Sequence, residues 1–138
     1  MTNRRILCAL DMLDGSEDVL NEALRLAGTD ASQLTLLHVI PPDEPFELQA
    51  TDRHARLVAL AQAARAACAH LEVVVLQGDP ADVILRHAGS TAVNLIVLGA
   101  SRRAGDGRLR EGHVGERVAA RAACATLVVS QGVLIPHP

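Results

Sequence analysis

The residues best placed for chemistry follow the first and fourth apolar runs of the chain. Asp11 ends the first run, and an arginine-rich segment bounded by Gly99 and Gly112 follows the fourth. A carboxylate at a strand end can accept from ribose hydroxyls or hold a metal, and it can equally cap a helix or a turn. The glycine-bounded segment suits an anion, because glycines let backbone N–H groups approach a ligand, and it equally suits a solvated loop. Position alone leaves both alternatives open.

The basic residues of that segment favour a phosphate over a neutral ligand. Arginine forms charge-assisted hydrogen bonds with phosphate oxygens. Because the chain contains no lysine, arginine side chains would have to supply these contacts. The segment carries more arginines than acids: Arg102, Arg103, Arg108 and Arg110 against Asp106 and Glu111.

Several common activities are excluded by residues that the chain lacks. All 13 basic side chains are arginines, so there is no P-loop lysine, no Schiff-base lysine and no receiver-domain lysine. No two histidines stand four positions apart, and no G-x-S-x-G turn is present, which argues against a helical zinc site and a serine triad. The cysteines, Cys8, Cys68 and Cys124, form no C-x-x-C pair and are expected to be reduced thiols, mostly buried.

Alternating strands and helices must position these residues. Strands are expected at 4–10, 33–39, 71–76, 93–98 and 125–129. Helices are expected where apolar residues recur at helical spacing from Val19 to Ala27, at 52–69, from Pro80 onward and at 112–123. The strands read as continuous apolar runs, which indicates burial on both faces. The order predicts one open α/β domain over residues 1–138, with a five-stranded parallel sheet covered by helices on both faces.

Local signals mark the helix ends. Asp14 and Glu17 have the spacing of a capping box before the first helix, and Gly28 is expected to end it. Asp79 is expected to be the N-cap of a helix whose first residue is Pro80.

Bulk composition limits the partners. The net charge is −3 and the single aromatic residue is Phe46, so nucleic acid is not an expected partner. No apolar run approaches a membrane span, and the first residues lack a signal peptide, which predicts a cytoplasmic protein without a membrane partner.

An ordered set of short motifs resembles the universal stress protein family along the whole chain. The motifs are Ile6-Leu7-Cys8-Ala9-Leu10-Asp11, Gly15-Ser16-Glu17, Leu36-Leu37-His38-Val39, Gly78-Asp79-Pro80-Ala81, Asn94-Leu95-Ile96-Val97-Leu98-Gly99, and Gly112 to Val118 followed by Ala123 to Val129. The resemblance implies the strand order 3-2-1-4-5 and frequent homodimers. It also implies that some members bind ATP, with Mg as the accompanying ion.

The resemblance assigns nucleotide-binding positions residue by residue. It implies that Asp11 contacts the ribose and Val39 the adenine, and that Ala9 and Val114 line the same site. The phosphates are held in the family by Gly-x2-Gly-x9-Gly followed by Ser or Thr. Here Gly99 and Gly112 match, whereas Arg102 replaces the second glycine and His113 replaces the Ser or Thr. Arg102 would crowd the phosphates, although both departures also supply polar or positive groups.

The C-terminal strand is expected to be a sheet edge that needs a cover. Val133, Leu134 and Ile135 follow it closely, so we expect pairing with a second copy across a two-fold axis. The alternative is that this tail folds back on its own domain.

Three functional hypotheses follow. The first is a non-catalytic stress-response homodimer that acts through partners and carries a degenerate adenine-nucleotide site. The second is an ATP-binding switch or slow ATPase. The third, an enzyme of a related adenine-nucleotide family, lacks the glycine-rich turn after the first strand and a His-x-Gly-His motif.

Overall fold

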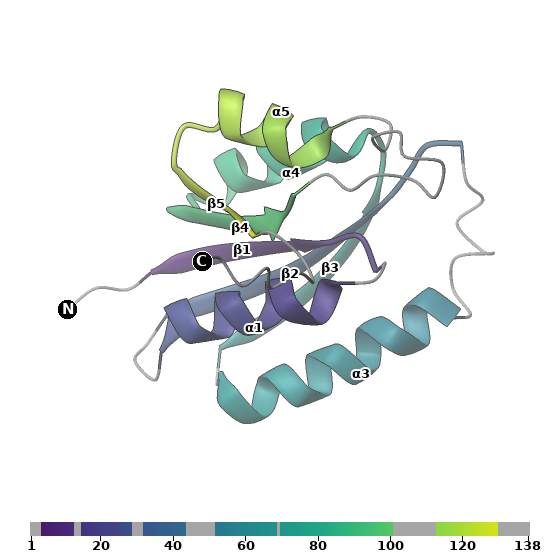
Figure 1. Ribbon diagram of the computed structural model, residues 1–138, viewed down its shortest axis with the longest axis vertical. Helices are drawn as coiled ribbons and strands as arrows, with labels where there is room; N and C mark the ends of the chain where they lie inside the picture. Colours follow the sequence, from purple (N-terminus) through teal and green to yellow (C-terminus); the bar gives the residue numbers. More distant parts are fainter. Residues whose placement is uncertain are drawn as a thin grey trace, which may run out of the picture.

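A parallel sheet of five strands organises the chain (Figure 1). The computed structural model describes residues 4–12, 15–28, 32–43, 52–68, 70–100 and 113–129. The strand order is β3-β2-β1-β4-β5, as expected from the resemblance. The strands are β1 (Arg5–Leu10), β2 (Gln33–Ile40), β3 (Leu71–Gln77), β4 (Leu95–Gly99) and β5 (Ala125–Val129).

Helices cover both faces of this sheet (Figure 1). The helices α1 (Ser16–Ala27) and α3 (Asp52–Ala67) pack on one face, and α4 (Pro80–Ser90) and α5 (Val114–Arg121) pack on the other. This three-layer arrangement buries the central strands on both sides, which explains their unbroken apolar sequences. The α/β class and the two helical layers were therefore predicted correctly.

Each face of the sheet has its own apolar core. Ile6, Leu36 and Val97 pack towards α1 and α3, and their side chains are no more than 1% exposed. Leu7, Leu37 and Ile96 point the other way, towards α4 and α5, and are fully buried. The alternation of side chains along a strand divides each apolar run between the two cores.

The helix ends agree with the sequence at three of four signals. Gly28 ends α1, and its N–H donates to the Leu24 carbonyl oxygen at 3.1 Å. Asp79 is the N-cap of α4 and accepts from the Asp82 N–H at 3.1 Å, with Pro80 at the first helical position. The expected capping box is wrong, because the N-cap of α1 is Gly15, whose left-handed φ of 95° only glycine adopts without strain. Asp14 lies outside the described residues.

Element bounds differ from the expected ranges by a few residues. The last helix is shorter than expected, since α5 begins at Val114 and ends at Arg121. The C-cap of α5 is Ala122, which has an extended backbone and releases the chain into β5. Likewise β4 begins at Leu95 instead of Val93, because Val93 and Asn94 still belong to the connection from α4.

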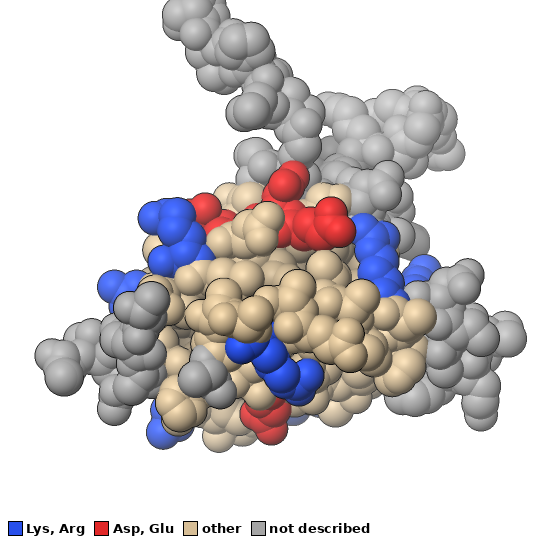
Figure 2. Space-filling view, turned by 90° about the horizontal axis from the view of Figure 1, so that it is seen from below, with Lys and Arg blue, Asp and Glu red and all other residues tan. Residues whose placement is uncertain are grey.

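The outer face of α3 is largely uncharged. Figure 2 views the side of the molecule that carries α1 and α3, and a broad uncharged area lies between scattered arginines and a group of acids. The exposed positions of α3 are mainly small residues such as Ala55, Ala59 and Ala63, together with Val58, which is 40% exposed. In the part of the chain that the structure describes, no helix is long and apolar enough to cross a membrane.

Candidate functional site

The carboxyl ends of β1, β2 and β4 meet at one edge of the sheet. The Cα partners Ala9 and Leu98 join β1 to β4, and Leu10 and His38 join β1 to β2, with all strands parallel. The first and fourth strands therefore end side by side, as predicted. Ligands of open α/β sheets bind at such an edge, where the strand order reverses.

Asp11 lies exposed directly after β1 and contacts the start of α1. Its Oδ1 accepts from the Ser16 hydroxyl at 3.3 Å. The next residue, Met12, is buried at a left-handed φ of 62°, and the Arg56 guanidinium donates to its carbonyl oxygen at 3.1 Å. A positive φ of this size is unfavourable for any residue other than glycine. The turn that carries Asp11 is thus held by α1 and α3 together.

A buried histidine, which the sequence did not single out, fixes the end of β1 against β2. His38 is 3% exposed, and its Nδ1 lies 2.9 Å from the Leu10 carbonyl oxygen. Because a carbonyl only accepts, Nδ1 carries the proton in this contact. The predicted site residues Ala9 and Val39 are the second-to-last residues of β1 and β2, so both stand at this edge of the sheet. Val39 is 8% exposed and Ala9 is partly buried. A polar residue inside an apolar strand was the available signal for His38.

A second residue missed by the sequence analysis, Gly115, brings α5 against the end of β4. A Cβ at this position would lie 2.8 Å from the Gly99 carbonyl oxygen and 3.5 Å from Val128. Only glycine therefore permits this approach of helix to strand. The sequence signal was a glycine in the first turn of a helix, where alanine has the higher helical propensity.

The start of α5 has no side-chain cap. Its N-cap, His113, is exposed at a left-handed φ of 44°, and its ring makes no capping hydrogen bond. Gly15 likewise caps α1 without a side chain. Helix N-termini carry partial positive charge and unsatisfied N–H groups, so α1 and α5 present two such ends to the same edge of the sheet. The predicted site residue Val114 is the first residue of α5 and is partly buried.

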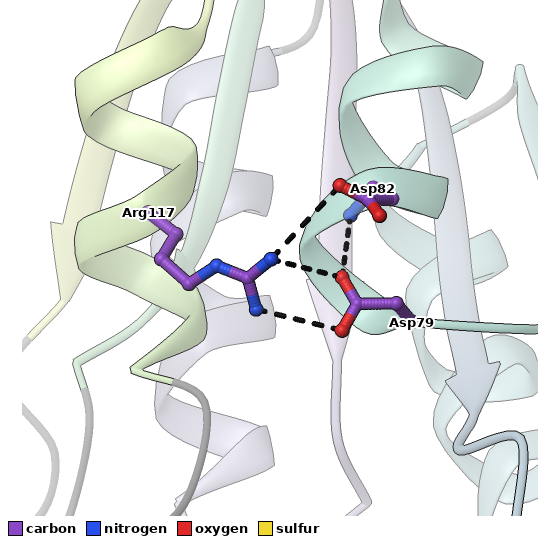
Figure 3. Close-up of polar contacts among 3 residues, drawn as sticks. All are labelled: Asp79, Asp82 and Arg117. Atoms are coloured by element: carbon purple, nitrogen blue, oxygen red, sulfur yellow. Dashed lines mark hydrogen bonds and ion pairs between the residues drawn. The ribbon is translucent and has the colours of Figure 1, made fainter.

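An ion pair joins the starts of α4 and α5 (Figure 3). The Arg117 guanidinium contacts both carboxylate oxygens of Asp79, with Nη2 to Oδ2 at 3.1 Å and Nη1 to Oδ1 at 3.5 Å. The Oδ1 of Asp82 lies 3.9 Å from the Nη2 of Arg117. The Asp82 N–H, followed by the Arg117 guanidinium, lowers the pKa of Asp79 below its usual value. The sequence had assigned Asp79 its role as a cap but had not predicted the partner.

The other predicted site residues lie in the segment between β4 and α5. Arg102 and Gly112, with Arg103, Arg108 and Arg110, lie outside the described residues. Cys8, Cys68 and Cys124 are free thiols, and burial raises the pKa of the Cys8 thiol far above its normal value. Within the described ranges, no three His, Cys, Asp or Glu side chains are grouped as a metal site would require.

A shallow cavity of about 290 Å³ lies at the opposite, amino edge of the sheet. Arg5, Gln33, Thr35 and Glu72 line it together with the connection from α4 to β4. It lies at the edge opposite the strand ends where ligands of open α/β sheets bind.

Comparison with known proteins identifies the family. Residues 2–130 match the model of the universal stress protein family. Universal stress protein YxiE of Bacillus subtilis is 27% identical over 144 residues, which span 91% of this chain and 97% of that protein. The structure of UspA from Lactobacillus plantarum superposes with a TM-score of 0.77 at 24% identity, covering 94% of this chain and 99% of that one. A universal stress protein solved in complex with cAMP has a TM-score of 0.69 at 21% identity, covering 94% and 98% of the two chains. The chain belongs to the universal stress protein family.

Proposed function

We propose that this protein is a non-catalytic, cytoplasmic stress-response homodimer with a degenerate adenine-nucleotide site at the carboxyl edge of its sheet. The observation that carries the site is the contact of Gly115 with the Gly99 carbonyl, which sets the uncapped start of α5 beside the ends of β4 and β1. Asp11 stands exposed at the end of β1, which pairs directly with β4. This geometry suits a ligand with an anionic end and a polar ribose.

Two residues depart from the pattern of the ATP-binding members of the family. His113 stands where ATP-binding members of the family place Ser or Thr, and its left-handed backbone carries the strain of a large side chain at that position. Arg102 stands where such members have a glycine. An ATP-bound Mg²⁺ would receive its ligands mainly from the phosphates, and Asp11 is the carboxylate that the end of β1 would offer it.

The second candidate is an ATP-binding switch or slow ATPase. The positive ends of α1 and α5 at the same edge favour it, as does the cAMP bound by one structural relative. The two candidates differ in affinity, because a switch must be occupied at cellular nucleotide concentrations and a degenerate site need not be.

Calorimetric titration with ATP, ADP and AMP, each with magnesium, separates the candidates. We expect the wild-type protein to bind ATP only in the millimolar range, and the double variant Arg102→Gly/His113→Ser to bind at least about tenfold more tightly, which corresponds to about 1.4 kcal/mol. Gly89→Ala, on α4, is the control, since a Cβ there meets nothing within 4 Å. Micromolar binding by the wild type, or ATP released from the purified protein and identified by mass spectrometry, would establish the switch instead.

A further inference from the structure

Arg117 is placed between two helix starts, and this position suggests a role beyond packing. It lies in the first half of α5, four residues after the N-cap His113, or about 6 Å along the helix axis. Helical side chains lean towards the N-terminus of their helix. The guanidinium accordingly reaches the N-cap of α4, and Figure 3 shows it extended between the two helices.

The ion pair is accessible and easily exchanged. The Arg117 and Asp79 side chains are 34% and 42% exposed. Asp79 also accepts a hydrogen bond from the Asp82 N–H, so its carboxylate keeps a partner when the guanidinium moves away. An exposed ion pair contributes only up to about 1 kcal/mol. An incoming anion can therefore replace Asp79 without leaving a buried charge unpaired.

We propose that Arg117 determines the charge specificity of the site, with Asp79 as an internal competitor for its guanidinium. In the free protein Asp79 holds Arg117, and a polyphosphate at the start of α5 takes over the guanidinium in forked hydrogen bonds. This inference rests on the proposed site, and it adds the group that distinguishes a triphosphate from a monophosphate. A neutral ligand gains nothing from the exchange.

A purely structural tie between α4 and α5 predicts a different result. If Arg117 only held the helices together, removing either partner would loosen α5 and weaken binding in the same direction. If Asp79 competes with the ligand, the two removals act in opposite directions. The sign of the Asp79 variant therefore decides between the two roles.

The test is calorimetric titration of the full-length wild type, Asp79→Asn, Arg117→Met and Arg117→Lys with sodium tripolyphosphate, ATP and AMP. Asparagine caps a helix as well as aspartate does, so Asp79→Asn removes the charge and keeps the start of α4. We expect Asp79→Asn to bind tripolyphosphate and ATP up to about fivefold more tightly, because the ligand no longer has to displace an ion pair worth up to about 1 kcal/mol. Arg117→Met should bind both about tenfold more weakly, and AMP should change less in either variant.

Arg117→Lys keeps the charge without the planar fork and should fall between wild type and Arg117→Met. Circular dichroism shows whether each variant is folded. If Arg117→Met does not fold, Arg117→Lys still tests the role of the guanidinium. Weaker binding of polyphosphate by Asp79→Asn, or no binding of any ligand by the wild type at millimolar concentration, overturns the inference. If tripolyphosphate follows the expected order but ATP binds no better than tripolyphosphate, the inference holds and the proposed adenine-nucleotide site is wrong.

Discussion

At the scale of single residues, the close packing of α5 against β4 depends on an absent side chain. Gly115 lets the first turn of α5 lie against the Gly99 carbonyl at the end of β4. The obstacle to a larger residue is backbone, which cannot rotate away as a flexible side chain can. This contact fixes where the N–H groups of α5 stand relative to the strand end, so the stability of the fold and the geometry of the proposed site depend on the same packing contact.

We expect Gly115→Ala to destabilise the protein by about 1–3 kcal/mol, since the added methyl group would lie 2.8 Å from the Gly99 carbonyl oxygen. Urea denaturation of the two proteins measures the difference in the free energy of unfolding. The matched control is Gly89→Ala in α4, where a Cβ meets nothing within 4 Å. There alanine should increase the free energy of unfolding by up to about 1 kcal/mol, because it has the higher helix propensity. Equal effects at the two glycines would contradict the proposed packing.

The pKa of Asp79 gives stability a defined dependence on pH. The pKa is lowered from the ordinary value of 3.8, so the charged form favours the folded state. This contribution is complete above the unfolded pKa and is lost as pH falls through the lower, folded pKa. Wild type should therefore exceed Asp79→Asn in stability by a constant amount at neutral pH, and the difference should shrink below about pH 3.8.

Denaturant titrations of both proteins over a series of pH values measure that difference. Both proteins keep a side-chain cap on α4, so the comparison isolates the charge from the hydrogen bond of the cap. A difference that stays constant into strong acid would show that the Asp79 charge contributes nothing to the folded state.

At the scale of elements, α3 shows how burial separates adjacent residues of one helix. Leu57 is 3% exposed and packs in the core with α1, whereas the next residue, Val58, is 40% exposed. We expect Leu57→Ala to cost about 2–5 kcal/mol, through lost burial and the cavity that remains. Val58→Ala should stay within about 0.5 kcal/mol, because the side chain already faces solvent.

Thermal or urea unfolding of the two variants checks the orientation of α3 directly. The pair is a stringent test because the residues are adjacent and both are aliphatic. A larger loss from Val58→Ala than from Leu57→Ala would mean that another surface covers the outer face of α3, such as that of a second copy.

At the scale of the whole molecule, β5 is an edge strand with partly exposed apolar residues. Leu127, Val128 and Val129 are each only partly buried. The Val129 carbonyl accepts from the Ala100 N–H at 2.9 Å, so the backbone groups of Val129 face β4. Because the backbone groups of successive strand residues point in opposite directions, those of Thr126 and Val128 face away from the sheet. An outward row of such groups can pair with a second chain.

We expect wild type to elute as a dimer at micromolar concentration in size-exclusion chromatography with light scattering. Thr126→Pro should elute as a monomer with unchanged circular dichroism, because proline removes an outward N–H and is tolerated on an edge strand. A wild-type monomer would refute the dimer, and a dimeric Thr126→Pro would move the interface away from β5.

The agreement between sequence and structure is highest for the central strands and for α4. Continuous apolar runs predicted β1, β2 and β4 within one or two residues at each end, because burial on both faces leaves few alternatives. Asp79 and Pro80 predicted the start of α4, because cap chemistry is local. The capping box before α1 was wrong because a glycine can take over a helix start without any side-chain hydrogen bond.

The sequence by itself determined the alternation of strands and helices, the family and the positions of the candidate residues along the chain. These follow from patterns of neighbouring residues, which the chain carries whatever its fold. The tertiary structure alone decided that Arg117 meets Asp79, that His38 supports Leu10 and that Gly115 faces Gly99. Each of these contacts joins residues far apart in the chain or on different elements, so its existence depends on how the helices pack on the sheet.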